Sequence, residues 1–242
     1  MINRVSVGII GYGRFGQLLA DLLANDFKIQ VHDIYIQSTD TVIAVDLKKI
    51  ALCSTLFIAT PIREMQAVLQ SLSPYLTGQH TLIDTCSVKC YPVDMMQKYL
   101  PKKTGIIASH PMFGPDSIQK QKRPKWVLHP IRDLYNVYPF WKQYLNKKFD
   151  VINLTPEQHD QYAAKSQGIT HLIGRILESM EISTTPIDTF GFEQLLKLMQ
   201  QTCYDNQTLF VDLQRYNPFS QAMFLKFEKA FLKMKTLINA KE

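Results

Sequence analysis

Two polar side chains follow neighbouring apolar runs of this sequence and are the ones best placed for chemistry. His110 leaves the run 105–108 and enters a loop rich in Pro and Gly, and Ser87 lies just after the preceding run 81–84. Histidine titrates nearest neutrality, so a neutral imidazole can take up a proton during a reaction. A lone histidine is more often structural, but a serine hydroxyl can hydrogen-bond an imidazole nitrogen. We therefore predict that His110 and Ser87 act together at a catalytic site.

A glycine-rich turn near the start of the sequence predicts a dinucleotide site. Its six residues form a GxGxxG motif between the apolar run 4–10 and a helical pattern over 14–25: Gly11, Tyr12, Gly13, Arg14, Phe15 and Gly16. In such turns the first glycine permits the tight bend, the second lets backbone N–H groups approach a pyrophosphate, and the third lets helix and strand pack closely. The helix N-terminus adds a partial positive charge. The strand–turn–helix context favours this interpretation over a merely structural turn.

An acidic residue discriminates between the two common nicotinamide cofactors. Asp33 ends the next β-rich run, 28–34, where a carboxylate can accept hydrogen bonds from the ribose hydroxyls of the adenosine. The same carboxylate would repel a 2′-phosphate, which favours NAD over NADP. His32 and Arg14 would each favour a phosphate, so NADP stays open as the alternative.

Short apolar runs alternate with helical patterns over 1–150, which is typical of a parallel sheet wrapped by helices. The runs expected as strands are 4–10, 28–34, 42–45, 55–59, 81–84, 105–108 and, as a short edge strand, 125–128. We predict an α/β fold with an N-terminal doubly wound sheet of the Rossmann type. Ligands of such sheets gather at the carboxyl ends of the strands, so the glycine turn, Ser87 and His110 should face one crevice.

Beyond residue 155 the strand signals stop and helical periodicity takes over. Thr155 and Gln158 form a capping box with Pro156 at the first helical position, which predicts a helix from there to about residue 181. Further helices are expected over 192–203, 208–215 and 218–238. We therefore expect a nucleotide-binding domain over 1–152 and a smaller all-α domain over 153–242. The apolar residues of the helical part predict packing against a second copy of the chain.

The composition limits the remaining classes of function. With 242 residues, 46% of them hydrophobic, the chain can bury a sizeable core and is not disordered. No apolar run approaches the ~20 residues of a membrane span, and the first strand begins too early for a cleaved signal peptide. The net charge of +6 comes from scattered lysines, which favours an anionic small molecule over nucleic acid. Four cysteines without CxxC or zinc-like spacing predict reduced thiols in the cytoplasm and no metal site.

Several segments together resemble the prephenate/arogenate dehydrogenases of tyrosine biosynthesis. In the first half these are GIIGYGRFGQ (8–17), FIATPI (57–62), DTCSVK (84–89) and SHPMFGPD (109–116). In the second half, EQHDQYAAKSQGITHLIGRIL (157–177) and LFVDLQRYNP (209–218) resemble two helices of the same family. The likeness covers nearly the whole chain in order, and HPMFGPD with the stretch 167–171 is far more specific than GxGxxG alone.

The resemblance implies an NAD(P)-dependent oxidative decarboxylation in which prephenate becomes 4-hydroxyphenylpyruvate, with the conversion of arogenate to tyrosine as the alternative. Hydride leaves the hydroxyl-bearing ring carbon for the nicotinamide while the ring carboxylate departs as carbon dioxide. His110 would draw off the hydroxyl proton, and Ser87 would fix the orientation and tautomer of its ring. Thr60 and Pro61, in the FIATPI segment, would line the cofactor near its nicotinamide.

The same resemblance places the substrate-binding groups in the helical half. Gln167, His171 and Arg175 are spaced to line one helix face, where we expect them to meet the substrate, with a solvated polar stripe as the alternative. Arg175 could equally pair with a carboxylate of the second subunit. An arginine that grips the substrate's side-chain carboxylate in some members aligns with Val211 here, and Arg215, one turn on, is the expected substitute.

Two other functions stay open at this point. A 2- or 3-hydroxyacid dehydrogenase shares the two-domain plan but relies on a lysine of the helical domain, for which Lys165 is the candidate. An NAD-sensing protein without turnover would keep the glycines but have no use for His110 beside Ser87. His129 and His159 receive no catalytic role, and His159 looks structural. The expected assembly is a cytoplasmic homodimer, joined through the helical domain, that acts on a small molecule.

Overall fold

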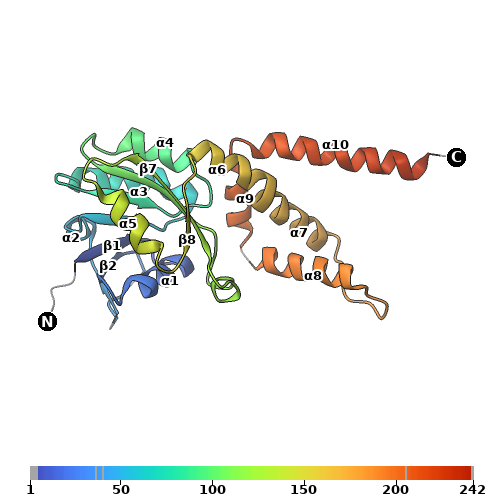
Figure 1. Cartoon of the computed structure of the whole chain (residues 1–242), viewed down its shortest axis with the longest axis horizontal. Coiled ribbons are helices and arrows are strands. Elements are labelled where there is room, and N and C mark those ends of the chain that lie inside the picture. Colours follow the sequence, from blue (N-terminus) through green and yellow to red (C-terminus); the bar gives the residue numbers. More distant parts are fainter. Residues whose placement is uncertain (1–4, 36, 40, 205, 241–242) are drawn as a thin grey trace. The chain divides into compact units, whose positions relative to one another are not determined.

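Figure 1 shows a computed structural model of the chain, which describes residues 5–35, 37–39, 41–204 and 206–240. The chain divides into two compact units, of which the first ends at His159 and the second begins at Asp160. This division falls inside helix α6 (Pro156–Ala163), later than the boundary at 152–153 expected from the sequence. The difference arises because the first turn of that helix packs with the sheet, through a contact described below.

An eight-stranded sheet forms the first unit, in the order β3-β2-β1-β4-β5-β6-β7-β8. Its strands are β1 (Ser6–Ile10), β2 (Lys28–His32), β3 (Val42–Ala44), β4 (Thr55–Ile58), β5 (Thr81–Asp84), β6 (Gly105–Pro111), β7 (Lys125–Arg132) and β8 (Asp150–Ile152). The six strands β1 to β6 are parallel to one another, β7 is antiparallel to β6, and β8 is parallel to β7. The predicted Rossmann-type sheet is confirmed, and the carboxyl ends of β1, β4, β5 and β6 follow one another along one edge.

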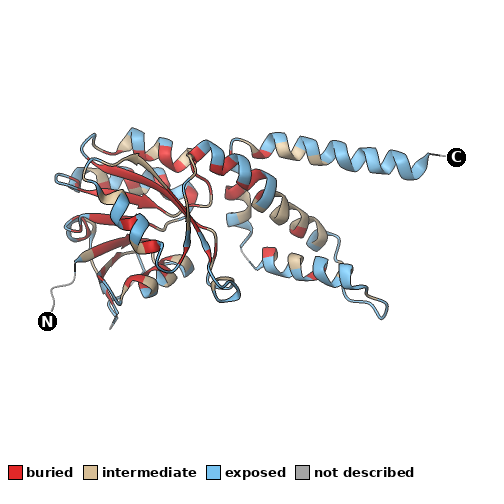
Figure 2. Cartoon of the chain, viewed as in Figure 1, coloured by how far each residue is buried: buried red, intermediate tan, exposed pale blue. Residues whose placement is uncertain are grey.

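The helices of the first unit pack their apolar faces on this sheet. They are α1 (Arg14–Leu23), α2 (Leu47–Ile50), α3 (Met65–Leu72), α4 (Cys90–Tyr99) and α5 (Val137–Leu145), with 3₁₀ turns at Ile62–Glu64, Ser73–Tyr75 and Ile118–Lys120. Strands β4, β5 and β6 are buried along their whole length (Figure 2), as expected for parallel strands covered on both faces. Trp141 joins α5 to the sheet, with its ring 5.0 Å from that of Phe57 and 5.3 Å from that of Phe27. The strands that carry the predicted site residues are therefore held in a rigid core.

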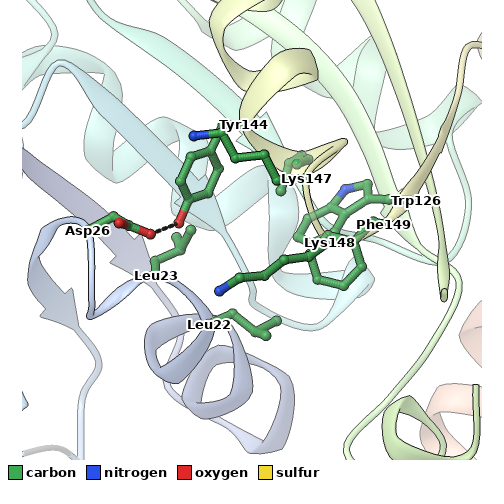
Figure 3. A pocket seen from close by; sticks show the side chains of 9 residues that line it. Leu22, Leu23, Asp26, Trp126, Tyr144, Lys147, Lys148 and Phe149 are labelled. Atoms are coloured by element: carbon green, nitrogen blue, oxygen red, sulfur yellow. Dashed lines mark hydrogen bonds between the residues drawn. The ribbon is translucent and has the colours of Figure 1, made fainter. Parts of the chain in front are cut away.

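A small cavity of about 120 Å³ lies where the end of α1 meets the segment after α5 (Figure 3). Its floor is apolar, with Leu23, Trp126 and Phe149, and the hydroxyl of Tyr144 donates a hydrogen bond to Asp26 Oδ2 at 2.7 Å on one side. Because α1 runs back from the glycine turn, its last residues lie at the opposite edge of the sheet from the strand carboxyl ends. The cavity is thus separate from the predicted site.

The second unit is helical. Its elements are the rest of α6, a π-helical turn (Ala164–Gly168), α7 (Ile169–Ser179), α8 (Phe190–Cys203), α9 (Gln207–Arg215) and α10 (Ser220–Asn239). Helices α7 and α8 pack closely at Gly174, where a Cβ atom would collide with the hydroxyl of Thr202. The glycine therefore sets how near the two helices approach.

The predicted capping box at the start of α6 is confirmed. The backbone N–H of Gln158 donates to Thr155 Oγ1 at 3.2 Å, and the N–H of Thr155 donates to Gln158 Oε1 at 3.1 Å. The sequence predicts one continuous helix from Pro156, but the π-turn interrupts it. The i→i+5 hydrogen bonding of this turn rotates the side chains of α6 about the helix axis relative to those of α7.

Two parts of the sheet differ from the sequence prediction. Strand β7 continues to Arg132, and it is not an edge strand because β8 pairs with its outer side. Strand β8 has three residues, which is too short to leave an alternating pattern in the sequence.

Candidate active site

The glycine turn joins β1 to α1, and its three glycines have different neighbours. Gly11 has φ +95°, in the left-handed region, and a Cβ there would lie 2.7 Å from the carbonyl oxygen of Ala59. A Cβ on Gly16 would collide with the carbonyl oxygen of Gly11. A Cβ on Gly13 would meet nothing within 4 Å. Gly11 and Gly16 are therefore required by packing, whereas Gly13 borders open space at the N-terminus of α1, as a pyrophosphate site requires.

Asp33 follows β2 and lies against this turn. Its carboxylate accepts hydrogen bonds from the backbone N–H groups of Tyr12, at 2.7 Å, and Tyr35, at 3.1 Å. Each oxygen of a carboxylate can accept more than one hydrogen bond, so Asp33 keeps acceptor capacity for ribose hydroxyls. The two residues that would favour a 2′-phosphate are engaged within the protein. His32 Nδ1 lies 2.9 Å from the carbonyl oxygen of Val45, and Arg14 Nη2 lies 2.5 Å from Asp116 Oδ2.

Thr60 follows β4, the neighbour of β1, and closes the turn from the other side. Its methyl group would lie 2.9 Å from a Cβ on Gly11. Its hydroxyl oxygen is buried and has no hydrogen-bond partner among the residues that the structure describes. A buried hydroxyl without a partner is costly, so a ligand that bonds to it would be stabilised. Thr60 and the open space at Gly13 thus fit a bound dinucleotide, and the adjacent Pro61 begins the 3₁₀ turn Ile62–Glu64.

A buried ion pair connects the ends of β5 and β6. The ammonium of Lys89 donates to Asp84 Oδ1 and to the carbonyl oxygen of Ser109, and both charged side chains are almost completely buried. Asp84 also accepts hydrogen bonds from the N–H groups of Cys86, at 3.0 Å, and Ser109, at 3.1 Å. The Ser109 hydroxyl in turn accepts a hydrogen bond from Trp126 Nε1 at 2.7 Å. The backbone N–H and C=O groups of Ser109, the residue before His110, are therefore both held by hydrogen bonds.

His110 lies near the end of β6 and is only 3% exposed. Its Nδ1 lies 2.8 Å from Nε2 of His159, the residue that ends the first unit. Burial lowers the pKa of His110 well below its usual value, and the neighbouring His159 and Lys89 lower it further. The imidazole is therefore neutral at physiological pH, as a proton acceptor must be.

The hydrogen bond predicted between Ser87 and the ring of His110 is not present among the residues that the structure describes. Ser87 lies half-buried between β5 and α4. His159 contacts Nδ1 instead, which the sequence reasoning missed. The available signal was the capping box at Thr155, which places His159 in the first turn of α6, where its N–H donates to the Thr155 carbonyl at 2.9 Å.

The helical unit carries the remaining predicted residues. His171 and Arg175 lie four residues apart on α7, but Gln167 lies inside the π-turn, so the regular spacing expected for all three holds only for His171 and Arg175. Arg175 pairs with Glu178 at 2.9 Å, and its guanidinium lies 5.8 Å from the ring centroid of Phe210. Gln167 Oε1 is buried and has no hydrogen-bond partner in the described part of the chain.

Arg215, the last residue of α9, borders a groove of about 670 Å³ in the same unit. Val211, the position at which the family arginine was expected, lines the same groove one helical turn earlier. Gln214 also lines it and is held by a hydrogen bond from its Nε2 to the carbonyl oxygen of Gly168 at 2.8 Å. The side chains of Val211 and Arg215 thus border one space.

Comparison with known proteins identifies the family. A family model for the nucleotide-binding domain of prephenate dehydrogenase matches residues 30–131, and one for the TYRAAT1-like C-terminal domain matches residues 176–242. Arogenate dehydrogenase 2, chloroplastic, of Arabidopsis thaliana is 30% identical over 96% of this chain and 70% of its own length. The chain belongs to the prephenate/arogenate dehydrogenase family.

A further relative and two solved structures are also similar to this chain, and the structures show the shared fold. Arogenate dehydrogenase 1, chloroplastic, of Arabidopsis thaliana is 31% identical over 97% of this chain, which spans 39% of that protein's length. Prephenate dehydrogenase from A. aeolicus, solved with hydroxyphenyl propionate and NAD+, shares the fold with a TM-score of 0.74 at 20% identity, over 98% of this chain and 91% of its own. Synechocystis arogenate dehydrogenase has the same TM-score of 0.74 and the same 20% identity, over 97% of this chain and 92% of its own.

The described residues form neither a metal-binding cluster nor a membrane-spanning helix. No group of three or more His, Cys, Asp or Glu side chains that could hold a metal ion occurs among the described residues. No helix within the same residues is long and apolar enough to cross a membrane.

Proposed function

We propose that this chain catalyses the NAD-dependent oxidative decarboxylation of prephenate or arogenate. The observation that carries the proposal is a neutral, buried histidine at the end of β6, on the sheet edge that also carries the glycine turn. Family membership makes this edge the expected reaction centre. Prephenate is the substrate expected from the sequence, and the two plant relatives that cover most of this chain are named arogenate dehydrogenases, which favours arogenate equally.

The proposed role of His110 is to accept the proton of the substrate's ring hydroxyl. As that proton moves to the imidazole, the hydroxyl-bearing carbon loses hydride and becomes a carbonyl carbon. The bond to the ring carboxylate then breaks and carbon dioxide leaves, the electron pair of that bond completes the aromatic ring, and the former carbonyl oxygen takes the proton back from His110 to become a phenol. Aromatisation drives the reaction, so the protein supplies mainly alignment and the proton acceptor.

NAD, when bound, supplies the hydride acceptor. We propose that Gly13 and the first turn of α1 hold its pyrophosphate, that Asp33 holds the adenosine ribose, and that Thr60 with Pro61 borders the nicotinamide. NAD is favoured over NADP because the carboxylate of Asp33 lies at the glycine turn, while His32 and Arg14 are engaged with Val45 and Asp116.

Substrate carboxylates need cationic or hydrogen-bonding partners, and the helical unit carries the candidates. We propose that Arg215 takes the role of the arginine missing at position 211, because both positions line one groove. Gln167 and His171 are proposed as further substrate contacts. Arg175 is proposed as a supporting residue, since it already pairs with Glu178. Ser87 remains a proposed member of the site at the end of β5, and we propose that His159, which contacts Nδ1 of His110, takes the larger part in orienting the ring.

A second copy of the chain is the proposed partner. Helix α10 exposes large apolar side chains over most of its length: Leu225, Phe231, Leu232, Met234, Leu237 and Ile238. Exposed apolar patches of this kind mark protein interfaces, so we propose a homodimer joined through the helical unit. The cytoplasm is the proposed compartment, on the basis of four free cysteines in patterns typical of reducing conditions.

The proposed activity is tested by following nicotinamide reduction at 340 nm (a wavelength at which only the reduced cofactor absorbs) in four mixtures. These contain the protein with prephenate or arogenate, each with NAD or NADP. We expect turnover of one or both substrates with NAD and weak or no turnover with NADP. Absence of reduction in all four mixtures would contradict the proposed function.

A further inference from the structure

We propose that His159 is the positioning residue of His110: it accepts a hydrogen bond from the Nδ1–H of His110 and so leaves Nε2 of His110 as the proton acceptor. The inference rests on the proposed function for its catalytic consequence. Its structural content, the tautomer of one ring, can be measured without any substrate.

The geometry of the pair is that of a hydrogen bond between two imidazoles. Nδ1 of His110 lies 2.8 Å from Nε2 of His159, and the ring planes are inclined by 67°. His110 and His159 are 3% and 2% exposed, so bulk water does not compete for this bond. A neutral imidazole has one donor and one acceptor nitrogen, so only one of the two facing nitrogens can carry the proton.

Both rings are held by well-bonded backbone. His110 follows Ser109, whose N–H and C=O are bonded to Asp84 and Lys89. His159 lies in the first turn of α6, whose start is fixed by the capping box at Thr155. The pair therefore joins the end of a core strand to a fixed helix N-terminus.

The choice of tautomer decides whether His110 can work as a base. If His159 Nε2 donated to His110 Nδ1, the proton of His110 would sit on Nε2 and the ring could not accept another there. If His110 Nδ1–H donates instead, Nε2 keeps its lone pair for the substrate hydroxyl. Base catalysis at Nε2 therefore requires the second arrangement, which His159 supplies as an acceptor.

The chemical type of the partner decides how firmly His110 holds a proton. The cation that faces His110 is Lys89, which is itself paired with Asp84. An aspartate in place of His159 would favour the imidazolium, as the carboxylate does in the Ser-His-Asp triad. The His159 ring carries no negative charge, so as an acceptor it fixes the tautomer without holding the proton so firmly. His110 can then return the proton to the phenol oxygen within each turnover.

Two substitutions at one position separate positioning from packing. His159→Leu keeps bulk but removes the acceptor, whereas His159→Gln places an amide oxygen near the position of Nε2. Histidine-selective ¹⁵N labelling of the whole chain reports the tautomer of His110, which is assigned by the disappearance of its signals in His110→Asn. Turnover, NAD affinity and thermal stability are measured on the same variants.

We expect a protonated Nδ1 and an unprotonated Nε2 at His110 in the wild type and in His159→Gln. In His159→Leu the Nε2–H tautomer, which free histidine prefers in water, should gain population. The kcat of His159→Leu should fall about 10²-fold while its NAD affinity stays unchanged, and His159→Gln should keep most of the wild-type kcat.

A wild-type His110 with its proton on Nε2 would overturn the inference, as would a His159→Leu variant with unchanged tautomer and kcat. If His159→Leu does not fold, the wild-type tautomer and the His159→Gln variant still decide the question. If the tautomer is as proposed but neither prephenate nor arogenate is turned over, the proposed function fails and the positioning of the ring stands.

Discussion

The neutral imidazole of His110 results from its surroundings, and each contribution has a named source. Burial is the largest, because a cation loses its hydration there, and the nearby His159 and Lys89 disfavour a further positive charge. A proton acceptor needs this state when the substrate arrives. The same residues that fix the position of the ring therefore also fix its charge.

The lowered pKa of His110 predicts the pH dependence of both activity and stability. Because the folded protein resists protonation of this ring, kcat/KM should stay flat as the pH falls through the ordinary imidazole value of 6.5 and decline only at lower pH.

The unfolded chain takes up the proton near its ordinary pKa, so the free energy of unfolding should fall as the pH drops below that value. Urea unfolding between pH 7 and pH 5 checks the second effect, which should be smaller in His110→Asn. An acid limb of kcat/KM above pH 6.5 would contradict the assignment.

The glycines of the turn give a matched pair of substitutions. Gly13→Ala adds a methyl group to open space, so we expect an unchanged melting temperature and about tenfold weaker NAD binding, ~1.4 kcal/mol. Gly16→Ala pushes a methyl group against the Gly11 carbonyl, so we expect a loss of ~1–3 kcal/mol in unfolding free energy. Calorimetric titration with NAD and urea unfolding distinguish the two. Equal NAD affinity of Gly13→Ala and the wild type would place the pyrophosphate elsewhere.

Sequence reasoning at the scale of single residues succeeds where the cause is local. The packing roles of Gly11 and Gly16 and the Thr155 capping box depend on a few consecutive residues, and the structure has each of them. The partner of His110 depends instead on a contact across 49 residues, between a strand and a helix. The position of Ser87 after the neighbouring strand predicts a contact with His110, but proximity of strand ends does not determine which side chain reaches a given nitrogen.

At the scale of elements, the connection between β5 and β6 is held by the buried pair of Asp84 and Lys89. Burial raises the pKa of Asp84, while the charge of Lys89 and three hydrogen bonds oppose that rise. Lys89 also bonds to the backbone of Ser109. The pair therefore ties the loop after β5 to the residue that precedes His110.

Removal of either Asp84 or Lys89 should lower the free energy of unfolding strongly. Lys89→Met leaves the Asp84 carboxylate buried without its cation, and Asp84→Asn leaves the ammonium uncompensated, so each should lose about 3–5 kcal/mol of unfolding free energy. The double variant should lose less than the sum of the two. Asp116→Ala, which breaks an ion pair that is about half exposed, is the control and should cost no more than ~1 kcal/mol in urea unfolding. Additive losses in the double variant would show that the two buried groups do not interact.

The elements that sequence could predict are those with strong periodicity. The strands of the parallel sheet read as apolar runs because both faces are buried, and the long helices repeat apolar residues at helical spacing. Strand β8, with three residues, and the π-turn within 164–168 leave no such pattern. The π-turn has a consequence for the site, since it removes Gln167 from the regular spacing of His171 and Arg175.

At the scale of the whole molecule, the exposed apolar side chains of α10 are the basis for the proposed interface with a partner. A second copy is the partner that the helical unit was expected to have. The dinucleotide turn and His110 both belong to the first unit, whereas α10 belongs to the second.

The proposed dimer predicts a solution mass of twice the 27.9 kDa of one chain. Light scattering after size exclusion should give this mass for the wild type. Phe231→Glu combined with Leu237→Glu should give the monomer, because both side chains are more than half exposed on α10 and charges there oppose apolar association. Leu52→Glu, at an apolar site on the first unit that is even more exposed than Phe231 and Leu237, should leave the dimer intact. A monomeric wild type would contradict the proposed assembly.

The central claim is that His110 receives the substrate's hydroxyl proton, and the kcat of His110→Asn tests it most directly. The substitution keeps a polar side chain but cannot take up a proton at neutral pH. With NAD affinity equal to that of the wild type, we predict a fall in kcat of about 10²-fold or more on whichever substrate the wild type turns over. A variant that binds NAD normally and keeps kcat within about threefold of the wild type would contradict the claim.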